Sequence, residues 1–334
     1  MPTPFDPPLH RVIELPEQDS WPFAYHRFDQ ESVWAVQTAL AIRRPLLLRG
    51  EPGIGKSQLA RAVAKELRVP FLYHVVDERS ERDDLMHAYD AVARLAEAQV
   101  SSLAARQDSD DWRERLVERN FVRPGVLWWA FDWASARKQA EDFHARLRRS
   151  WRPPVIPDGW KPDADRACGP VVLLDEIDKA DPSVPNGLLE CLGNEGFQTA
   201  QLGEAVRLPK GAKPPLVIIT TNEERELPSA FLRRCLVLHM QFPKDKDAAI
   251  GFLEQRATRL VEELRLSPEV CRAVAECIVA DRAEARGRSA LPGASEFLEL
   301  LRALAAYHPD DPKAQKERLK QIAGFALRKH DSFS

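Results

Sequence analysis

The sequence predicts an α/β fold with a parallel sheet, followed by a small all-helical domain. Short apolar runs at residues 45–49, 71–76, 171–175 and 215–222 lack the alternation of a half-exposed strand, which is typical of central parallel strands covered on both faces. A helical pattern separates the first two runs, so strand, loop, helix and strand follow one another as in a βαβ unit. After residue 246 the apolar spacing is helical throughout.

These changes of pattern divide the chain into three parts. Residues 1–22 are rich in proline and lack periodicity, so they are expected to form an extended arm. Residues 23–243 carry the α/β domain, which opens with a helix and ends with a fifth short strand, and residues 244–334 form the helical domain. An insertion is expected at about residues 135–165, as a loop whose exposed tryptophans and prolines contact a partner or a neighbouring subunit.

The composition excludes several classes of protein. The 334 residues include 48 Lys and Arg against 51 Asp and Glu, a net charge of −3, whereas proteins that coat nucleic acid usually carry a strong basic excess. With 44% hydrophobic and 30% charged residues, the chain has the composition of an ordinary globular protein. No apolar run approaches the roughly 18 residues of a membrane helix, and the first residues lack the layout of a signal peptide. A cytoplasmic location without membrane contact is therefore expected.

An eight-residue segment after the first strand matches the pattern G-x-x-x-x-G-K-S/T. Its glycines allow the backbone to wrap with N–H groups pointing inward, and the following helix presents its positive N-terminus to the same anion. Lys56 can then reach the β and γ phosphates of a nucleotide, and the hydroxyl of Ser57 can ligate magnesium. The segment therefore predicts a site for ATP and Mg²⁺. It consists of Gly50, Glu51, Pro52, Gly53, Ile54, Gly55, Lys56 and Ser57.

Two adjacent carboxylates, Asp175 and Glu176, follow the third apolar run. Ligands collect at the carboxyl ends of parallel strands, so both side chains are expected at the phosphate site. Because alternation along the strand turns them in different directions, Asp175 is expected to hold magnesium through water, and Glu176 to orient and deprotonate the attacking water. Asp178 and Asp181 are expected to start and cap the next helix or to pair with Lys179.

With both motifs placed, the sequence resembles the AAA+ ATPases and, within them, the MoxR-like group. Five matching segments occur in family order, and the resemblance covers roughly residues 24–300. It implies a P-loop NTPase core of the AAA+ type with a parallel sheet, followed by a small all-helical lid domain. The segments are PLLLRGEPGIGKS, DDLMHAYDAVARL, RPGVLWWAF, VVLLDEIDKADPSVPNGLLECL and VIITTNEERELPSAFLRRC.

The resemblance also implies roles for polar residues further along the chain. Asn222 stands at the position of sensor 1, which helps to place the attacking water. Arg233 and Arg234 stand where the family has its arginine finger, which reaches the nucleotide of the neighbouring subunit, and Arg234 is the preferred of the two.

Other segments correspond to family elements outside the catalytic motifs. In the predicted lid, Phe297 stands where the family has the sensor 2 arginine, and Arg288 and Arg302 are the alternative arginines of this region. The segments after Asp84 and at 196–209 resemble the helix-2 insertion and the pre-sensor-1 hairpin, which commonly face the centre of a ring.

The resemblance implies a magnesium-dependent ATPase that forms a homo-oligomeric ring, expected to be a hexamer, and remodels a protein client as a chaperone does. A protein with a von Willebrand factor A domain is an expected partner. One alternative is a motor stimulated by nucleic acid, since residues 137–152 are basic and aromatic. Acidic residues within that stretch favour a solvated helix face instead. Another alternative is a slow nucleotide switch or scaffold in a multi-protein assembly, for instance a defence system.

Overall fold

The structure is a computed structural model that describes residues 5–9, 11–104, 114–148, 150–162, 167–284 and 291–327. The chain forms two compact units, and each is assembled from separate segments of the sequence. Among the helices of the described residues, none combines the length and the apolar composition that a membrane span requires. Unit 1 comprises Met1–Asp6, Glu31–Leu48 and Val63–Leu238, and unit 2 comprises Pro7–Gln30, Arg49–Ala62 and His239–Ser334.

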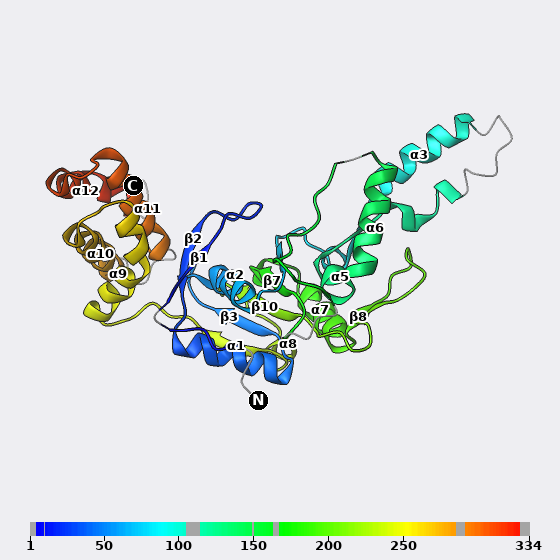
Figure 1. Ribbon diagram of the computed structural model, residues 1–334, viewed down its shortest axis with the longest axis horizontal. Helices are drawn as coiled ribbons and strands as arrows, with labels where there is room; N and C mark the ends of the chain where they lie inside the picture. Colours follow the sequence, from blue (N-terminus) through cyan, green and yellow to red (C-terminus); the bar gives the residue numbers. More distant parts are fainter. Residues whose placement is uncertain are drawn as a thin grey trace. The chain divides into compact units, whose positions relative to one another are not determined.

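A five-stranded parallel sheet in the order β11-β3-β10-β7-β4 forms the centre of unit 1 (Figure 1). Its three consecutive strands β10, β7 and β4 are in register, because Val171 of β7 pairs with both Phe71 of β4 and Leu216 of β10. Four of these strands coincide with the four apolar runs of the sequence, and β11 is the fifth short strand expected at the end of the α/β domain. The strands are β3 (Leu46–Arg49), β4 (Phe71–Val75), β7 (Val171–Asp175), β10 (Leu216–Thr221) and β11 (Leu236–His239).

Helices cover this sheet with apolar side chains. Trp128, Leu188 and Phe231, from three different helices, lie in the same buried cluster as Leu174 of the inner strand β7. The α-helices are α1 (Gln30–Ile42), α2 (Lys56–Leu67), α5 (Val126–Phe131), α6 (Trp133–Arg146), α7 (Ser183–Gly193) and α8 (Ser229–Leu232), and the short 3₁₀ helices are η1 (Arg82–Leu85), η2 (Glu118–Phe121) and η3 (Ile177–Lys179).

Two antiparallel strand pairs extend unit 1 beyond its central sheet. One pair, β5 (His87–Tyr89) with β6 (Val122–Pro124), encloses helix α3 (Ala91–Ala104), at the position expected for the helix-2 insertion. The other, β8 (Gly196–Phe197) with β9 (Val206–Arg207), is a hairpin within the segment 196–209, as the sequence predicts.

The segment expected as a tryptophan-rich loop begins in a helix and continues over residues 150–162 without regular secondary structure. Its first part continues α6, and the ring of Trp133 lies 4.7 Å from that of Trp160 and 5.0 Å from that of Trp129. Trp151 stacks on His144 at 5.3 Å, and Trp160 is only 7% exposed. The prediction of a loop with exposed tryptophans is therefore wrong for Trp160, because these rings bury one another. Positions 149 and 163–165 of the insertion lie outside the described residues.

Unit 2 combines a small strand pair with a bundle of four helices (Figure 1). Strand β1 (Val12–Leu15) pairs antiparallel with β2 (Ala24–Arg27), so residues 1–22 are more than an extended arm. The sequence misses β1 because only two of its side chains, Ile13 and Leu15, are buried. The helices are α9 (Lys246–Glu263), α10 (Pro268–Glu284), α11 (Ala294–Tyr307) and α12 (Pro312–Leu327), which confirms the helical pattern after residue 246.

Candidate active site

The loop between β3 and α2 has the backbone conformation of a phosphate cradle. Gly50, Gly53 and Gly55 have φ angles of 151°, 75° and 98°, which glycine adopts much more readily than residues with a side chain. A Cβ on Gly50 would lie 2.2 Å from the carbonyl oxygen of Met240, so only glycine fits there. The loop ends at Lys56, where helix α2 begins and presents its free backbone N–H groups.

Lys56 is held over this loop. The side chain is 6% exposed, and its Nζ donates hydrogen bonds to the carbonyl oxygens of Gly50 at 2.7 Å and Glu51 at 3.0 Å. A buried ammonium beside a glycine cradle and a helix N-terminus fits the phosphate chain of a nucleotide. Ser57, in the first turn of α2, has the hydroxyl that would ligate magnesium.

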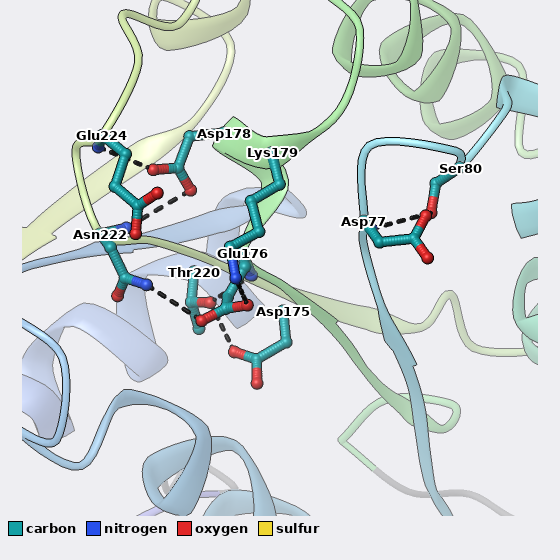
Figure 2. Close-up of polar contacts among 9 residues, drawn as sticks. All are labelled: Asp77, Ser80, Asp175, Glu176, Asp178, Lys179, Thr220, Asn222 and Glu224. Atoms are coloured by element: carbon teal, nitrogen blue, oxygen red, sulfur yellow. Dashed lines mark hydrogen bonds and ion pairs between the residues drawn. The ribbon is translucent and has the colours of Figure 1, made fainter.

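The carboxylates lie at the carboxyl end of strand β7 in unit 1 (Figure 2). Oδ1 of Asp175 accepts a hydrogen bond of 2.5 Å from the hydroxyl of Thr220, on the neighbouring strand β10. The same hydroxyl accepts one of 2.8 Å from the backbone N–H of Glu176. Thr220 is fully buried, so it fixes both acidic residues at once. Sequence reasoning missed it, although the available signal was a pair of threonines at the end of an apolar strand.

Glu176 is the most constrained residue of this cluster. Its backbone lies in the left-handed region, with φ 61° and ψ 47°, which is uncommon for a residue with a side chain. Oε1 accepts a hydrogen bond of 3.0 Å from Nδ2 of Asn222, and Oε2 accepts one of 2.6 Å from Nζ of Lys179 (Figure 2). The structure therefore brings together Glu176 and Asn222, as the resemblance implies.

Lys179 and Asp178 have roles other than those expected. Lys179 pairs with Glu176 and not with Asp178 or Asp181, and its hydrogen bond to Glu176 raises the pKa of the ammonium. The carboxylate of Asp178, which is 3% exposed, accepts hydrogen bonds from the backbone N–H groups of Asn222 at 3.4 Å and Glu224 at 2.9 Å. Asp178 therefore fixes the loop after β10.

Asp181 contacts the N-terminus of α7, as expected for a capping residue. Its Oδ1 accepts a hydrogen bond of 2.9 Å from the backbone N–H of Ser183, the first residue of α7. This contact satisfies one of the free N–H groups at the helix N-terminus.

The two arginines expected to act as a finger are exposed, at the end of the short helix α8. Their backbone is held by another arginine that sequence reasoning missed. Arg44 donates from Nε to the carbonyl oxygen of Arg234 at 3.0 Å, and from Nη2 to those of Arg233 and, at 3.4 Å, Cys235. The guanidinium side chains of Arg233 and Arg234 are thus carried on a fixed turn.

The helical unit has no arginine at the position of sensor 2. Phe297 is fully buried in the apolar core of α9–α12, where a guanidinium would lose its hydration. Arg302 is exposed on α11, and Arg288 lies outside the described residues. The phosphate loop belongs to the same unit, since Ile54 is 4% exposed and packs within that core.

Several solved structures are similar to this chain. A candidate ATPase from Cytophaga hutchinsonii is 15% identical, with 89% of this chain and 80% of that chain covered and a TM-score of 0.37. The Thermotoga maritima RuvB Holliday junction branch migration motor is 12% identical, with 88% and 67% covered and a TM-score of 0.42. NtrX from Brucella abortus in complex with ADP is 12% identical, with 92% and 57% covered and a TM-score of 0.48.

A search of the curated proteins gave no match. A family model does match, and it covers residues 45–235, more than half of the chain, from the start of β3 past the two arginines. This family is described as the AAA domain of the dynein-related subfamily. The matched range contains the phosphate loop, the carboxylates after β7 and Asn222. The chain therefore belongs to the AAA domain family, dynein-related subfamily.

Proposed function

We propose that this chain hydrolyses ATP in a magnesium-dependent reaction. The observation that carries the proposal is the environment of Glu176, a carboxylate that follows the inner strand β7 in a left-handed conformation and is oriented by Asn222. A strained backbone with an oriented acidic side chain is typical of a catalytic position. This geometry suits a general base, which must be within hydrogen-bond reach of the water whose proton it takes.

Each predicted residue has a task in this proposal. The backbone N–H groups of residues 53–55 and the ammonium of Lys56 would hold the phosphates, while Ser57 and Asp175 would hold Mg²⁺, the latter through water. ATP with Mg²⁺ supplies the transferable phosphoryl group and a cation that offsets its charge. Glu176 would accept a proton from water at one carboxylate oxygen, and Asn222 would keep that carboxylate oriented.

The proposal is tested by separating binding from turnover. Glu176→Gln should keep the thermal stabilisation that ATP and Mg²⁺ give the wild type, while phosphate release falls by about 10²- to 10⁴-fold. Lys56→Ala should lose the ATP-dependent stabilisation. Near-normal turnover in Glu176→Gln, or an undiminished shift in Lys56→Ala, would contradict these roles.

Matched controls are available for both variants. Glu195→Gln makes the same chemical change at an exposed glutamate that also has a left-handed backbone, with φ 48°. Lys65→Ala removes an exposed lysine from the same helix as Lys56. Both controls should bind and hydrolyse ATP as the wild type does.

We further propose a place in the MoxR-like group and assembly as a ring, with six subunits as the expected number. Arg234 or Arg233 would reach the nucleotide of the neighbouring subunit, and their exposure and the fixed backbone beneath them support this. Helix α3 and the β8–β9 hairpin would act on a protein client. Sedimentation of the Glu176→Gln variant with bound ATP tests whether a ring forms. A pull-down with the same variant from a lysate identifies a client, including one with a von Willebrand factor A domain.

The two alternatives have less support. In the basic stretch at 137–152, Arg137 pairs with Glu141 at 2.9 Å along α6, which is the pattern of a solvated helix face. A slow nucleotide switch would show ATP binding without the loss of turnover on Glu176→Gln, because there would be little turnover to lose. DNA- or RNA-stimulated hydrolysis at low salt would favour the motor instead.

A further inference from the structure

An arginine of the helical bundle lies against the phosphate loop. Arg256 belongs to α9, and a Cβ placed on Gly55 would lie 2.8 Å from its Nη1. Both residues belong to unit 2, so this approach is a feature of one compact body. Gly55 directly precedes Lys56, the residue at which α2 begins.

The guanidinium of Arg256 is poorly compensated. Burial lowers its pKa to about 10, and this effect is larger than the opposite effect of the carboxylate of Asp29. The ring of Phe252 lies beneath it, with its centroid 4.2 Å from Cζ. A desolvated cation of this kind is stabilised by an additional anion.

A second arginine of the bundle provides the contrast. Arg282 of α10 pairs with Glu51 of the loop at 2.7 Å, donates to the carbonyl oxygen of Pro292 at 2.8 Å and lies 4.0 Å from the ring of Phe242. The positive charge of Arg282 is therefore already neutralised by Glu51, and this ion pair links the loop to the bundle. Arg256 has the same approach to the loop without a comparable partner among the contacts described.

Arg256 also supplies a positive charge beside the phosphate loop, which the segment at the start of α11 lacks. The segment where the family has its sensor 2 arginine ends in the buried Phe297, yet this segment does touch the loop, because a Cβ on Gly53 would lie 2.1 Å from Oγ of Ser295. The bundle therefore contacts the loop at Gly53 through a hydroxyl and at Gly55 through a cation. A cation beside a phosphate cradle strengthens anion binding through charge-assisted hydrogen bonds.

We propose that Arg256 is a nucleotide-binding residue whose guanidinium binds the phosphate chain of a nucleoside di- or triphosphate from the helical side of the loop. This inference rests on the proposed nucleotide site and adds a residue on α9, outside both the phosphate loop and the Asp175–Glu176 motif. It predicts an unusual combination of effects. Replacing a desolvated cation with an apolar side chain should leave the ligand-free protein as stable as before or more so, while ligand binding weakens.

The test compares Arg256→Met with Arg256→Lys and with Arg259→Met, all on α9. Arg259 is exposed and pairs with Glu262 at 2.8 Å, so it is the matched control. Calorimetric titration with ADP, ATP and inorganic tripolyphosphate, each with Mg²⁺, gives the affinities, and melting without ligand gives the stability. Arg256→Met should bind all three about 10- to 100-fold more weakly at an unchanged or higher Tm. Arg256→Lys should recover part of the affinity, and Arg259→Met should match the wild type.

Three results would overturn the inference. If Arg256→Met bound with wild-type affinity, Arg256 would not contact the nucleotide. If the variant bound ATP and ADP more weakly but tripolyphosphate as tightly as the wild type, Arg256 would contact the nucleoside and not the phosphates. A lower Tm without ligand, large enough to account for the weaker binding, would make the residue structural. A wild-type protein that binds none of these compounds, or whose binding survives Lys56→Ala, would instead contradict the proposed function itself.

Discussion

Lys179 forms an ion pair with Glu176, the residue three positions before it, and the distance from Nζ to Oε2 is 2.6 Å. The ammonium shares this carboxylate with Asn222, which binds the other oxygen. A carboxylate held at both oxygens is restrained from turning toward water. The ion pair with Lys179 therefore hinders Glu176 in accepting a proton from water. Removing the pair should raise the rate of hydrolysis.

We expect Lys179→Met to raise the basal rate of ATP hydrolysis by up to about fivefold, since a half-exposed ion pair is worth at most about 1 kcal/mol. Phosphate release at saturating ATP measures this rate. Lys179→Arg preserves the charge and should remain close to the wild type. A rate in Lys179→Met that falls below the wild-type rate would show that the ammonium assists the reaction.

Thr220→Val should destabilise the fold. The substitution keeps the shape of the side chain but removes the hydroxyl that donates to Asp175 and accepts from the backbone N–H of Glu176. Leaving buried polar groups without partners costs about 1–3 kcal/mol each, and the free energy of unfolding in urea measures the sum. Thr220→Ser keeps the hydroxyl and should lose less. Equal stability in the two variants would contradict the bridging role.

Arg44→Ala should impair hydrolysis through the neighbouring subunit. The variant releases the carbonyl oxygens of Arg233 and Arg234, so the proposed finger is displaced and turnover falls about 10- to 100-fold. Mixing with Lys56→Ala subunits, whose own finger is intact, should restore part of the rate. Arg43→Ala, at the adjacent exposed position, is the control. Mixed rings without any rescue would argue against action between subunits.

His26 should make stability depend on pH. Burial, together with the charge of Arg256, lowers the pKa of its imidazole to about 3, whereas an unfolded histidine takes up a proton near pH 6.5. Between these values the unfolded state binds the additional proton. The free energy of unfolding therefore falls as the pH decreases from 6.5, by at most about 1.4 kcal/mol per pH unit from this residue.

Urea unfolding of His26→Phe at several pH values from 7.5 to 4.5 checks this expectation. The variant should show a shallower fall in stability than the wild type, because no imidazole is left to protonate in the unfolded state. His239→Phe, at an exposed position on β11, should keep the wild-type slope. Parallel profiles for all three proteins would contradict the role of His26.

The sequence predicts the central sheet because β3, β7 and β10 are continuous apolar runs, and their burial on both faces removes the alternation of a half-exposed strand. It predicts the phosphate loop and Asp175–Glu176 because these motifs are local. Strand β1 is missed since its two buried side chains lie among prolines and polar residues. Trp160 is misjudged because composition does not show that its ring packs on that of Trp133.

The contacts that position the active-site residues join parts of the chain that are far apart in the sequence, so sequence patterns do not predict them. Thr220 meets Asp175 from 45 positions away, and Arg44 meets Arg234 from 190 positions away. Arg256 and Gly55 likewise come together only after the helical bundle has formed. Sequence patterns record the period of a helix or strand, whereas these pairs depend on which elements become neighbours in the folded chain.

The left-handed backbone of Glu176 limits how the thermal stability of this protein can be increased. A non-glycine residue in this conformation costs about 1–2 kcal/mol, and glycine would relieve that strain. Selection for thermal stability alone would therefore favour glycine at this position and would discard the carboxylate with it. Stabilised versions of this chain should be sought at other positions, with position 176 kept fixed and turnover scored alongside melting.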